Sequence, residues 1–412
     1  MQFNKNKTAF IHQWYPFVEG YSKEFITNIL DEIDYEPQSA LDPFAGSGTT
    51  PVELQEMGIK CHSFEVSPFM HLLATVKLER GYKFQTFTDY HITIGSFLNG
   101  KLQPIRQMQE LPLAQTFQPK DGKKKWVFHR CVMDGILDIK HAISLVPELK
   151  YRKLFSIALA SILLDVSNVY RNGKCLSYKD GWQERKFTRR QVHQKFLDKV
   201  AKVIAPDIEK LERITTEVNN IKYCIHGDVR KSISTLPDRS IDLLITSPPY
   251  LNSRDYTDIY VVELWILDLI KSYDALKALR HNTFVSHVQV KHGQIETLDI
   301  AELKNVLNKL NSNKADLWNA DLPTMIQGYF RDMDVLFEQL AHKMIPQKKL
   351  FFNVANSAYH GVEIKVDEIV AEIAEMHGFK VDEIREARQL KTSSQQKDSI
   401  KSLRESVIVM TA

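Results

Sequence analysis

Apolar residues recur along this chain with two spacings, and their order predicts the fold. Seven short apolar or alternating runs predict strands, at 39–42, 60–66, 221–227, 241–247, 348–355, 380–389 and 405–411. Apolar residues three and four apart predict helices between them, at 49–57, 68–77, 154–169, 191–218, 257–271, 328–343 and 366–376. A strand, a glycine-rich turn, a helix and a second strand open the pattern. We therefore expect a doubly wound α/β sheet.

Two blocks interrupt this alternation and suggest the domain boundaries. Residues 1–84 form the first half of the predicted sheet domain, and residues 221–412 form the second half. Residues 85–220 between them are mostly helical in pattern, so we interpret them as a large insertion. A smaller irregular insertion is predicted at 272–327.

Composition places the chain among ordinary globular proteins, with 43% hydrophobic and 25% charged residues. Its apolar runs are too short for a membrane span, its N-terminus lacks an apolar signal segment, and its four cysteines are scattered. We therefore expect no metal site and a reducing, cytoplasmic location.

Charge is unevenly distributed along the chain. Residues 101–200 hold 20 Lys and Arg against 9 Asp and Glu, although the net charge of the whole chain is only +3. This surplus suggests a polyanionic partner. A lysine-rich solvated helical surface explains it equally well at this stage.

The first stretch with recognisable chemistry is Leu41-Asp-Pro-Phe-Ala-Gly-Ser-Gly-Thr-Thr50, where a predicted strand turns into a helix. Its two glycines let the backbone approach a ligand. Pro51 stands where a dinucleotide fingerprint needs its third glycine, and no Gly-Lys-Ser/Thr follows, which disfavours a pyrophosphate ligand.

Three acids, Asp42, Glu65 and Asp228, end three predicted strands. They suit a nucleoside with a cationic tail, because they can accept from an ammonium group, from ribose hydroxyls and from an adenine amino group. Each acid alone is more typical of a helix cap or a turn, so the prediction rests on the set.

Asp-Pro-Phe-Ala-Gly-Ser-Gly-Thr-Thr resembles the S-adenosylmethionine motif of DNA amino-methyltransferases, which make N4-methylcytosine or N6-methyladenine. The resemblance implies a seven-stranded Rossmann-like methyltransferase sheet. It places Phe44 and the glycines at the methionine, Glu65 at the ribose and Asp228 near the adenine. The implied cofactor site comprises Trp14, Tyr15, Pro16, Asp42, Pro43, Phe44, Gly46, Gly48, Thr49, Thr50, Glu65, Val66, Asp228 and Val229.

The second stretch is Ser247-Pro248-Pro249-Tyr250, which follows an apolar strand. Two prolines make a rigid edge without N–H groups. A planar base can stack on Tyr250 while its amino group donates to Ser247 Oγ and the Pro248 carbonyl. Because a paired base cannot reach such an edge, flipping is implied. The plainer interpretation is a proline-rich loop that ends a strand.

The residues around the proline pair narrow the chemistry. Methylation at cytosine C5 needs a thiolate after the prolines, and Tyr250 stands there instead. Ser247 is more typical of the N4-cytosine group than of the N6-adenine group, where Asp is usual. We therefore predict a sequence-specific cytosine-N4 DNA methyltransferase of a prokaryotic, nucleoid-associated restriction-modification system, with an independently acting cognate endonuclease as a candidate partner. An N6-adenine enzyme, an RNA guanine-N2 methyltransferase and a catalytically silent DNA-binding subunit are the alternatives.

We expect no recognition domain after the last predicted strand, so the 85–220 insertion is the candidate for reading duplex DNA. Its alternative role is a helical cap over the sheet. The predicted phosphate contacts are Lys123, Lys124, Lys125, Arg171, Arg185, Arg189 and Arg190.

Overall fold

The centre of the protein is a seven-stranded sheet. The computed structural model describes residues 3–17, 20–100, 117–172, 175–184, 187–252, 255–291, 293, 295–391 and 400–412. The strands of the sheet lie in the order β10-β11-β7-β6-β1-β2-β5. They are β1 (Ser39–Asp42), β2 (Lys60–Glu65), β5 (Cys224–His226), β6 (Ile241–Thr246), β7 (Met344–Ala355), β10 (Lys380–Lys391) and β11 (Ser402–Thr411).

Strand direction divides this sheet into two parts. β5, β2, β1, β6 and β7 are mutually parallel. β11 runs antiparallel to both of its neighbours, β7 and β10. All seven predicted strands are present, and the expected doubly wound, Rossmann-like α/β class is confirmed.

Alternating side chains give the sheet two apolar faces, as its pleat requires. Ala40, Leu243 and Phe351 share one face with α1 (Lys23–Glu32) and α2 (Thr49–Glu56). Neighbouring Leu41, Leu244 and Phe352 point to the other face. That face is covered by α9 (Val229–Ser232), α14 (Leu322–Lys343) and α15 (Val366–Met376).

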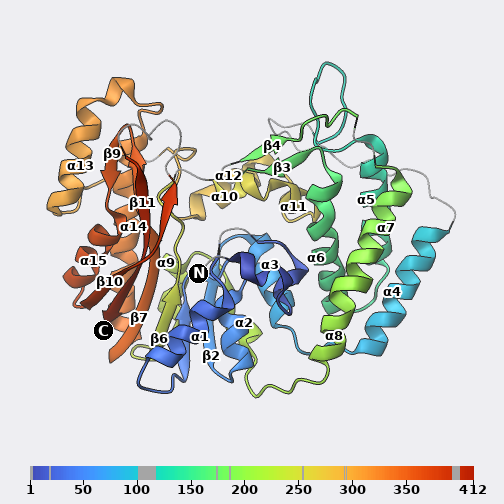
Figure 1. The fold of residues 1–412 in the computed structure, drawn as a ribbon, viewed down its shortest axis with the longest axis horizontal. Coiled ribbons are helices and arrows are strands. Elements are labelled where there is room, and N and C mark those ends of the chain that lie inside the picture. The colour runs from blue at the N-terminus through green and yellow to red at the C-terminus, as the bar shows by residue number, and fades with distance from the viewer. Residues whose placement is uncertain are drawn as a thin grey trace.

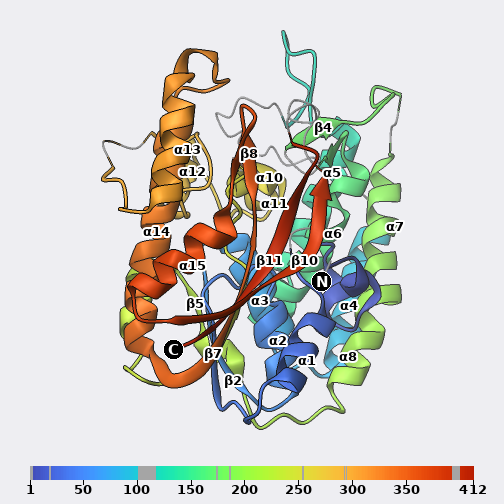
Figure 2. The same cartoon turned by 60° about the vertical axis from the view of Figure 1, so that its left-hand side comes forward.

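The 85–220 block stands to one side of the sheet, on the side away from α14 and α15 (Figures 1 and 2). Its α6 packs on α3 (Pro68–Leu78), and one apolar core runs through both. The described part of the block is largely helical. Its elements are α4 (Phe84–Asn99), α5 (Arg130–Ser144), α6 (Leu149–Val166), β3 (Val169–Arg171), β4 (Leu176–Tyr178), α7 (Arg189–Lys199), a π-helical turn η3 (Val200–Ile204) and α8 (Ala205–Leu211).

Several predicted elements have different bounds in the structure. The helix expected at 257–271 is two short helices, because Tyr260 leaves helical geometry between them. The helix expected at 328–343 begins six residues earlier, at Leu322, where Pro323 suits the first turn. The block at 272–327 was expected to be irregular, but it contains two regular helices. The two short helices that replace the predicted 257–271 helix are α10 (Tyr256–Ile259) and α11 (Val261–Ile266). The two helices of the 272–327 block are α12 (Tyr273–Asn282) and α13 (Ala301–Ser312).

Short elements complete the described chain. They are the turns η1 (Phe3–Thr8), η2 (His12–Trp14), η4 (Asn220–Tyr223), η5 (Ile233–Thr235) and η6 (Lys314–Asp316), and the strand pair β8 (Ser357–Tyr359) and β9 (Val362–Ile364). Among the helices that the structure describes, none combines the length and the apolar character needed to cross a membrane. Over the same described residues, His, Cys, Asp and Glu do not gather into a cluster that could hold a metal ion.

Candidate active site

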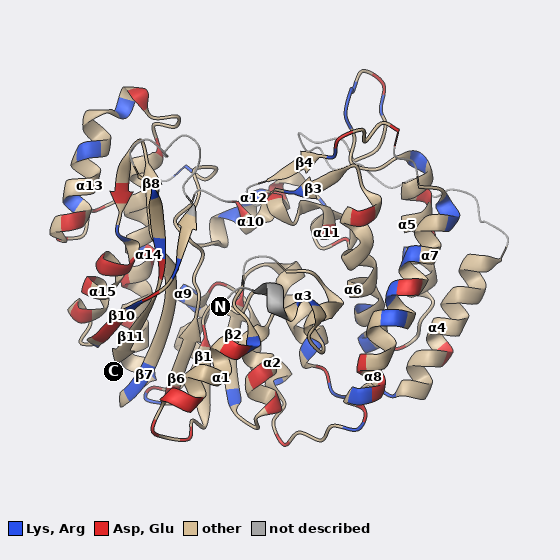
Figure 3. Ribbon diagram, viewed as in Figure 1, with Lys and Arg blue, Asp and Glu red and all other residues tan. Residues whose placement is uncertain are grey.

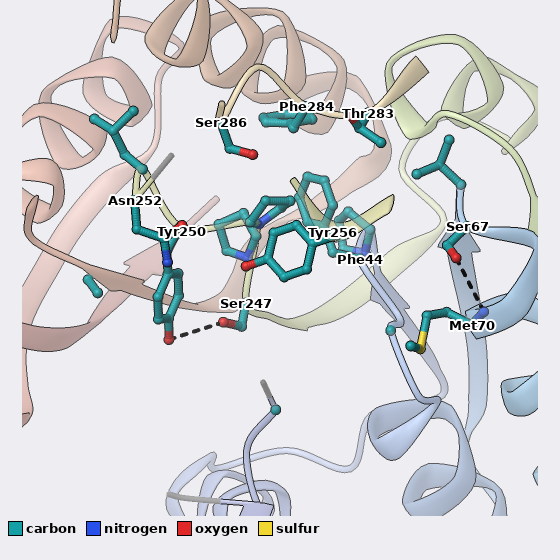
Figure 4. Close-up of a pocket in the computed structure, with 18 of the residues that line it drawn as sticks. Phe44, Ser67, Met70, Ser247, Tyr250, Asn252, Tyr256, Thr283, Phe284 and Ser286 are labelled. Carbon is teal, nitrogen blue, oxygen red and sulfur yellow. Dashed lines mark hydrogen bonds between the residues drawn. The ribbon is translucent and has the colours of Figure 1, made fainter. Parts of the chain in front are cut away.

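A cavity of about 750 Å³ opens at the carboxyl ends of the parallel strands. It lies where β1 and β6 pair and the connections leave in opposite directions along the sheet. Such a point is the usual ligand site of an open α/β sheet. The loops after β1, β2, β5, β6 and β7 all line it. Figure 4 shows Ser247 and Tyr250 toward one side of the cavity, Ser67 and Met70 at the other, and Tyr256 and Phe44 between them.

Most predicted site residues meet at this cavity. Those that line it are Pro43, Phe44, Gly46, Thr49, Glu65, Val66, Asp228, Val229, Ser247, Pro248, Pro249 and Tyr250. The predicted residues outside the lining are Trp14, Tyr15, Pro16, Asp42, Gly48 and Thr50. The two predicted stretches are therefore neighbours in space, although about two hundred residues separate them.

Gly48 shapes the turn from behind. Its φ is +81°, a region that disfavours side chains, and a Cβ there would stand 2.9 Å from the Cβ of Ala74. The absence of a side chain thus lets α3 pack directly against the turn. Beneath the turn, buried Lys77 donates from Nζ to the Ser47 carbonyl at 2.9 Å, and burial lowers the pKa of this lysine to about 7.

Glu65 holds the cavity side of the same turn. Its two carboxylate oxygens accept from the backbone N–H groups of Gly46 at 2.8 Å and Ser67 at 2.7 Å. The side chain still lines the cavity, but burial raises its pKa to about 7. Glu65 therefore positions the turn and keeps lone pairs for a ligand.

Asp42 lies under the cavity rather than in its wall. Its residue surface is 1% exposed. It accepts from the Thr246 hydroxyl at 2.7 Å, the Phe44 N–H at 3.1 Å and the Tyr21 hydroxyl at 3.4 Å. Burial raises its pKa to about 6. This carboxylate ties β1 to β6, so the predicted ammonium contact has no direct support in the cavity lining.

Asp228 is likewise bound within the protein. It caps α9 by accepting from the Arg230 N–H at 3.0 Å, and it pairs with the Arg230 guanidinium at 2.8 Å. Arg230 also pairs with Asp332 at 2.6 Å and lies over the ring of Phe284. Asp228 lines the cavity, but part of its accepting capacity is used by this pair.

The aromatic stretch at the N-terminus supports the site from outside. Trp14 is fully buried and donates from Nε1 to Asp207 at 2.8 Å. Tyr15 is also buried and donates from its hydroxyl to Glu263 at 2.8 Å. The residues of this segment that line the cavity are Phe17, Gly20 and Tyr21.

Aromatic rings form much of the cavity wall. Phe44 meets Phe284 edge to face, with ring centroids 4.8 Å apart. The rings of Tyr260 and Phe17 stack with their centroids 6.2 Å apart, and Tyr256 also lines the cavity. These flat surfaces suit planar heterocyclic ligands.

The Ser-Pro-Pro-Tyr turn is held by a polar cluster. The Tyr250 hydroxyl donates to Glu405 Oε1 at 2.7 Å and accepts from Asn353 Nδ2 at 2.9 Å. Ser247 Oγ lies 3.4 Å from the Tyr250 hydroxyl (Figure 4). Arg388 pairs with the other oxygen of Glu405. Burial and the nearby Glu405 carboxylate raise the pKa of Tyr250.

Sequence reasoning missed several of these groups. Phe284 lies outside both motifs, and nothing in its local pattern indicates that it meets the cavity. Glu405 offered one signal, a carboxylate at the start of the apolar run Ser406-Val-Ile-Val-Met410. Asn353 offered a similar signal, because it is a polar side chain within the apolar part of β7.

Three of the predicted phosphate contacts have partners inside the protein. Arg171 is 9% exposed, pairs with the fully buried Glu263, and lies 4.4 Å from the ring centroid of Tyr260. Arg189 pairs with Asp138. Arg190 donates to the carbonyls of Leu98 and Gly100. These bonds brace the helices and the cavity wall, so the structure favours a structural role for all three.

The remaining cations are differently placed. Lys123, Lys124 and Lys125 are exposed on the loop before α5. Lys125 Nζ lies 5.2 Å from the ring of Tyr178 in β4. Figure 3 shows Lys and Arg along this loop, at the same end of the molecule as β3 and β4. Arg185 lies outside the described residues.

Known proteins align with nearly the whole chain, although no family model matches it. The Type II methyltransferase M.BsoBI of Geobacillus stearothermophilus is 25% identical, over 96% of this chain and 84% of the relative. The Type II methyltransferase M.AvaI of Anabaena variabilis is 27% identical, over 93% and 82%. The Type II methyltransferase M.MvaI of Kocuria varians is 22% identical, over 90% and 82%. These alignments confirm the resemblance predicted from the motifs.

A solved structure also aligns, but too weakly to support an argument. It is the rRNA methyltransferase aviRa from Streptomyces viridochromogenes, with a TM-score of 0.27 and 9% identity over 99% of this chain and 93% of that one.

The close packing at Gly48 predicts that adding one methyl group at this position destabilises the fold. Gly48→Ala should lower the free energy of unfolding, because the new Cβ meets Ala74 in addition to occupying an unfavourable φ; overpacking of this kind costs about 1–3 kcal/mol. Gly58→Ala is the matched control, since its φ is +75° and no atom lies within 4 Å of its Cβ. Urea denaturation of both variants measures the difference. Equal losses would show that α3 does not constrain the turn.

Proposed function

We propose that this chain, which belongs with the Type II methyltransferases, transfers a methyl group from S-adenosylmethionine to the N4 amino group of a cytosine flipped out of duplex DNA. The observation that carries the proposal is the placement of Ser247-Pro-Pro-Tyr250 beside the Gly46-Ser-Gly48 turn in one cavity. In a restriction-modification system, such an enzyme would protect host DNA from a cognate endonuclease that acts independently.

The cavity fits this cofactor. The close approach at Gly48 leaves backbone rather than side chains at the turn, and Glu65 keeps acceptors for ribose hydroxyls. Phe44 and Phe284 offer apolar surface to an adenine ring. Bound there, S-adenosylmethionine supplies an activated methyl group. The residues proposed to hold it are Phe17, Pro43, Phe44, Gly46, Thr49, Glu65, Val66, Asp228 and Val229, with Trp14, Tyr15, Pro16, Asp42, Gly48 and Thr50 supporting them from behind.

The protein's own groups would act mainly by positioning the base. Ser247 Oγ and the Pro248 carbonyl can accept from an exocyclic amino group, which directs its lone pair toward the methyl group. The aromatic surface of Tyr250 or Tyr256 can support the flat ring. Holding the reacting groups together in this way supplies a large part of a transfer rate. An amino group paired in a duplex cannot enter the cavity, so the base must leave the stack.

Ser247 supports cytosine as the target. A serine side chain is short and neutral, and it accepts from an amino group without adding charge to the pocket. An adenine amino group meets the same acceptors, so the product must be identified directly.

The first test therefore identifies the product. The protein is incubated with labelled S-adenosylmethionine and mixed-sequence duplex DNA, which is then digested to nucleosides and analysed by mass. We expect N4-methyl-2′-deoxycytidine. N6-methyladenine would change the base and keep the mechanism, whereas label on RNA alone, or on no nucleic acid, would refute the DNA assignment.

The raised pKa of Glu65 predicts pH-dependent cofactor binding. Because burial holds the acid partly protonated near pH 7, the free protein must lose this proton to present a carboxylate to ribose hydroxyls. Affinity for S-adenosylmethionine should therefore rise with pH through about 7, by up to about tenfold per unit below that value.

Glu65→Gln tests this prediction by calorimetry between pH 6 and 8. The variant should bind more weakly and show no such slope, since glutamine does not titrate. A slope that persists in the variant would assign the pH dependence to another group.

The exposed lysine loop is proposed to contact phosphates. Changing Lys123, Lys124 and Lys125 to Gln should weaken binding to all duplex sequences and reduce the salt slope by about 0.9 per lost contact. Changing Lys202, Lys210 and Lys222 to Gln is the control, since these lysines are also exposed but belong to η3, α8 and η4. Of these elements, α8 lies at the opposite end of the molecule from β3 and β4 (Figure 1). If the two triple variants weaken DNA binding equally, the lysine loop contributes only through the net charge of the protein and makes no specific phosphate contacts.

A further inference from the structure

The antiparallel strand β11 brings a buried carboxylate to the catalytic turn. Parallel strands can offer only their ends to this edge of the sheet, but β11 runs the other way and offers its beginning. Glu405, the fourth residue of β11, pairs in register with Ala355, the last residue of β7. Only 4% of its surface is exposed. A charge so placed needs partners, since burial of an unpaired carboxylate is costly.

Three donors from three chain segments meet this carboxylate. Arg388 stands directly opposite Glu405 on β10 and pairs with one oxygen. The other oxygen, Oε1, accepts from the Tyr250 hydroxyl at 2.7 Å and from Asn353 Nδ2 at 3.1 Å. The ion pair with Arg388 compensates the negative charge of Glu405. This pair does not by itself explain why the second oxygen faces the Ser-Pro-Pro-Tyr turn.

The contacts of that second oxygen determine the direction of a hydrogen-bond chain. An ionised carboxylate can only accept, so Tyr250 and Asn353 must both donate to it. With its proton directed to Glu405, the Tyr250 oxygen is left to accept, and Ser247 lies 3.4 Å away as a donor. The Ser247 proton then points at Tyr250. Asn353 Nδ2 lies 3.4 Å from Ser247 Oγ as a donor to one lone pair, and the other lone pair is left for the cavity.

We propose that Glu405 is a positioning residue that orients the hydroxyl protons of Tyr250 and Ser247, so that Ser247 presents an acceptor to the amino group of the substrate base. The inference rests on the proposed function and deepens it. Asn353 takes part as a second fixed donor, because its Nδ2 also lies 2.9 Å from the Tyr250 hydroxyl. Glu405 takes no part in bond making and holds the acceptor that the reaction needs.

Glu405→Gln reverses this arrangement with almost no change of shape. The glutamine oxygen would face Arg388, which needs an acceptor, and the amide NH₂ would face Tyr250. The Tyr250 proton would turn toward Ser247, and the Ser247 proton would turn into the cavity, where it opposes the N–H of the base. We expect kcat to fall tenfold or more, while KM for S-adenosylmethionine and the melting temperature change little.

Tyr250→Phe interrupts the same hydrogen-bond chain at its middle residue. It also tests the proposal if E405Q does not fold. It should lower kcat as well. Adding E405Q to Y250F should cause no further loss, because the route from Glu405 to Ser247 is already broken. Additive losses in this double-mutant cycle, or an unchanged kcat in Y250F, would overturn the proposal.

Arg404→Gln controls for damage to the start of β11. Arg404 is the neighbouring residue, and it pairs with Asp367 of α15 at 2.6 Å. Its loss should lower stability and leave kcat unchanged. A kcat loss in R404Q as large as that in E405Q would assign both effects to the strand and overturn the proposal.

The wild type measured in the same assay separates the two hypotheses. If it methylates the amino group of cytosine in DNA and E405Q matches it, the proposed function stands and only the role of Glu405 fails. If the methylated base is adenine, the base assignment changes, and the comparison with E405Q judges the role of Glu405 in the same way. If it methylates neither base, the proposed function fails, and this inference fails with it.

Discussion

The arrangement of the site depends on a buried hydrogen bond that the Thr246 hydroxyl donates to the Asp42 carboxylate. It joins the ends of β1 and β6, the two strands from which the chain leaves in opposite directions along the sheet. The cofactor-type turn follows one strand and the Ser-Pro-Pro-Tyr turn follows the other. Their separation is therefore set by the spacing of two paired strands, about 4.8 Å, rather than by flexible loops. A transfer between two ligands needs such a fixed spacing.

Four acidic side chains at the cavity are bonded to other groups of the protein. Asp42 binds the two strand ends, Glu65 holds the backbone of the turn, Asp228 caps α9 beside Arg230, and Glu405 orients Tyr250. Burial raises the pKa of Asp42 and of Glu65 toward neutrality, which couples the site to pH. The site is therefore built from backbone, aromatic rings and hydroxyls, while the charges lie around and behind them.

The basic residues of the helical insertion fall into two groups, which the net charge of the insertion does not distinguish. Its inner surface shares a core with α3, and Arg171, Arg189 and Arg190 brace that core through bonds to Glu263, Asp138 and the carbonyls of α4 and Gly100. Three of its exposed lysines, Lys123, Lys124 and Lys125, are adjacent on the loop before α5. Among the residues that the structure describes, the basic surplus thus combines cations that are bonded within the protein with exposed lysines, and these exposed lysines are available to a polyanion.

The sequence by itself determined the sheet and its two turns. Strand periodicity predicted all seven strands, because alternation and apolar runs are local consequences of burial on a pleated sheet. The glycines and the proline pair predicted both turns, because these residues restrict or extend the backbone wherever they occur. Only the tertiary structure decided which polar groups meet. Glu405 reaches Tyr250 because β11 runs antiparallel between β7 and β10, and Arg230 pairs with Asp332 because α9 packs on α14. Local patterns carry no record of contacts between distant segments, and hydrogen-bond partners are set by those contacts.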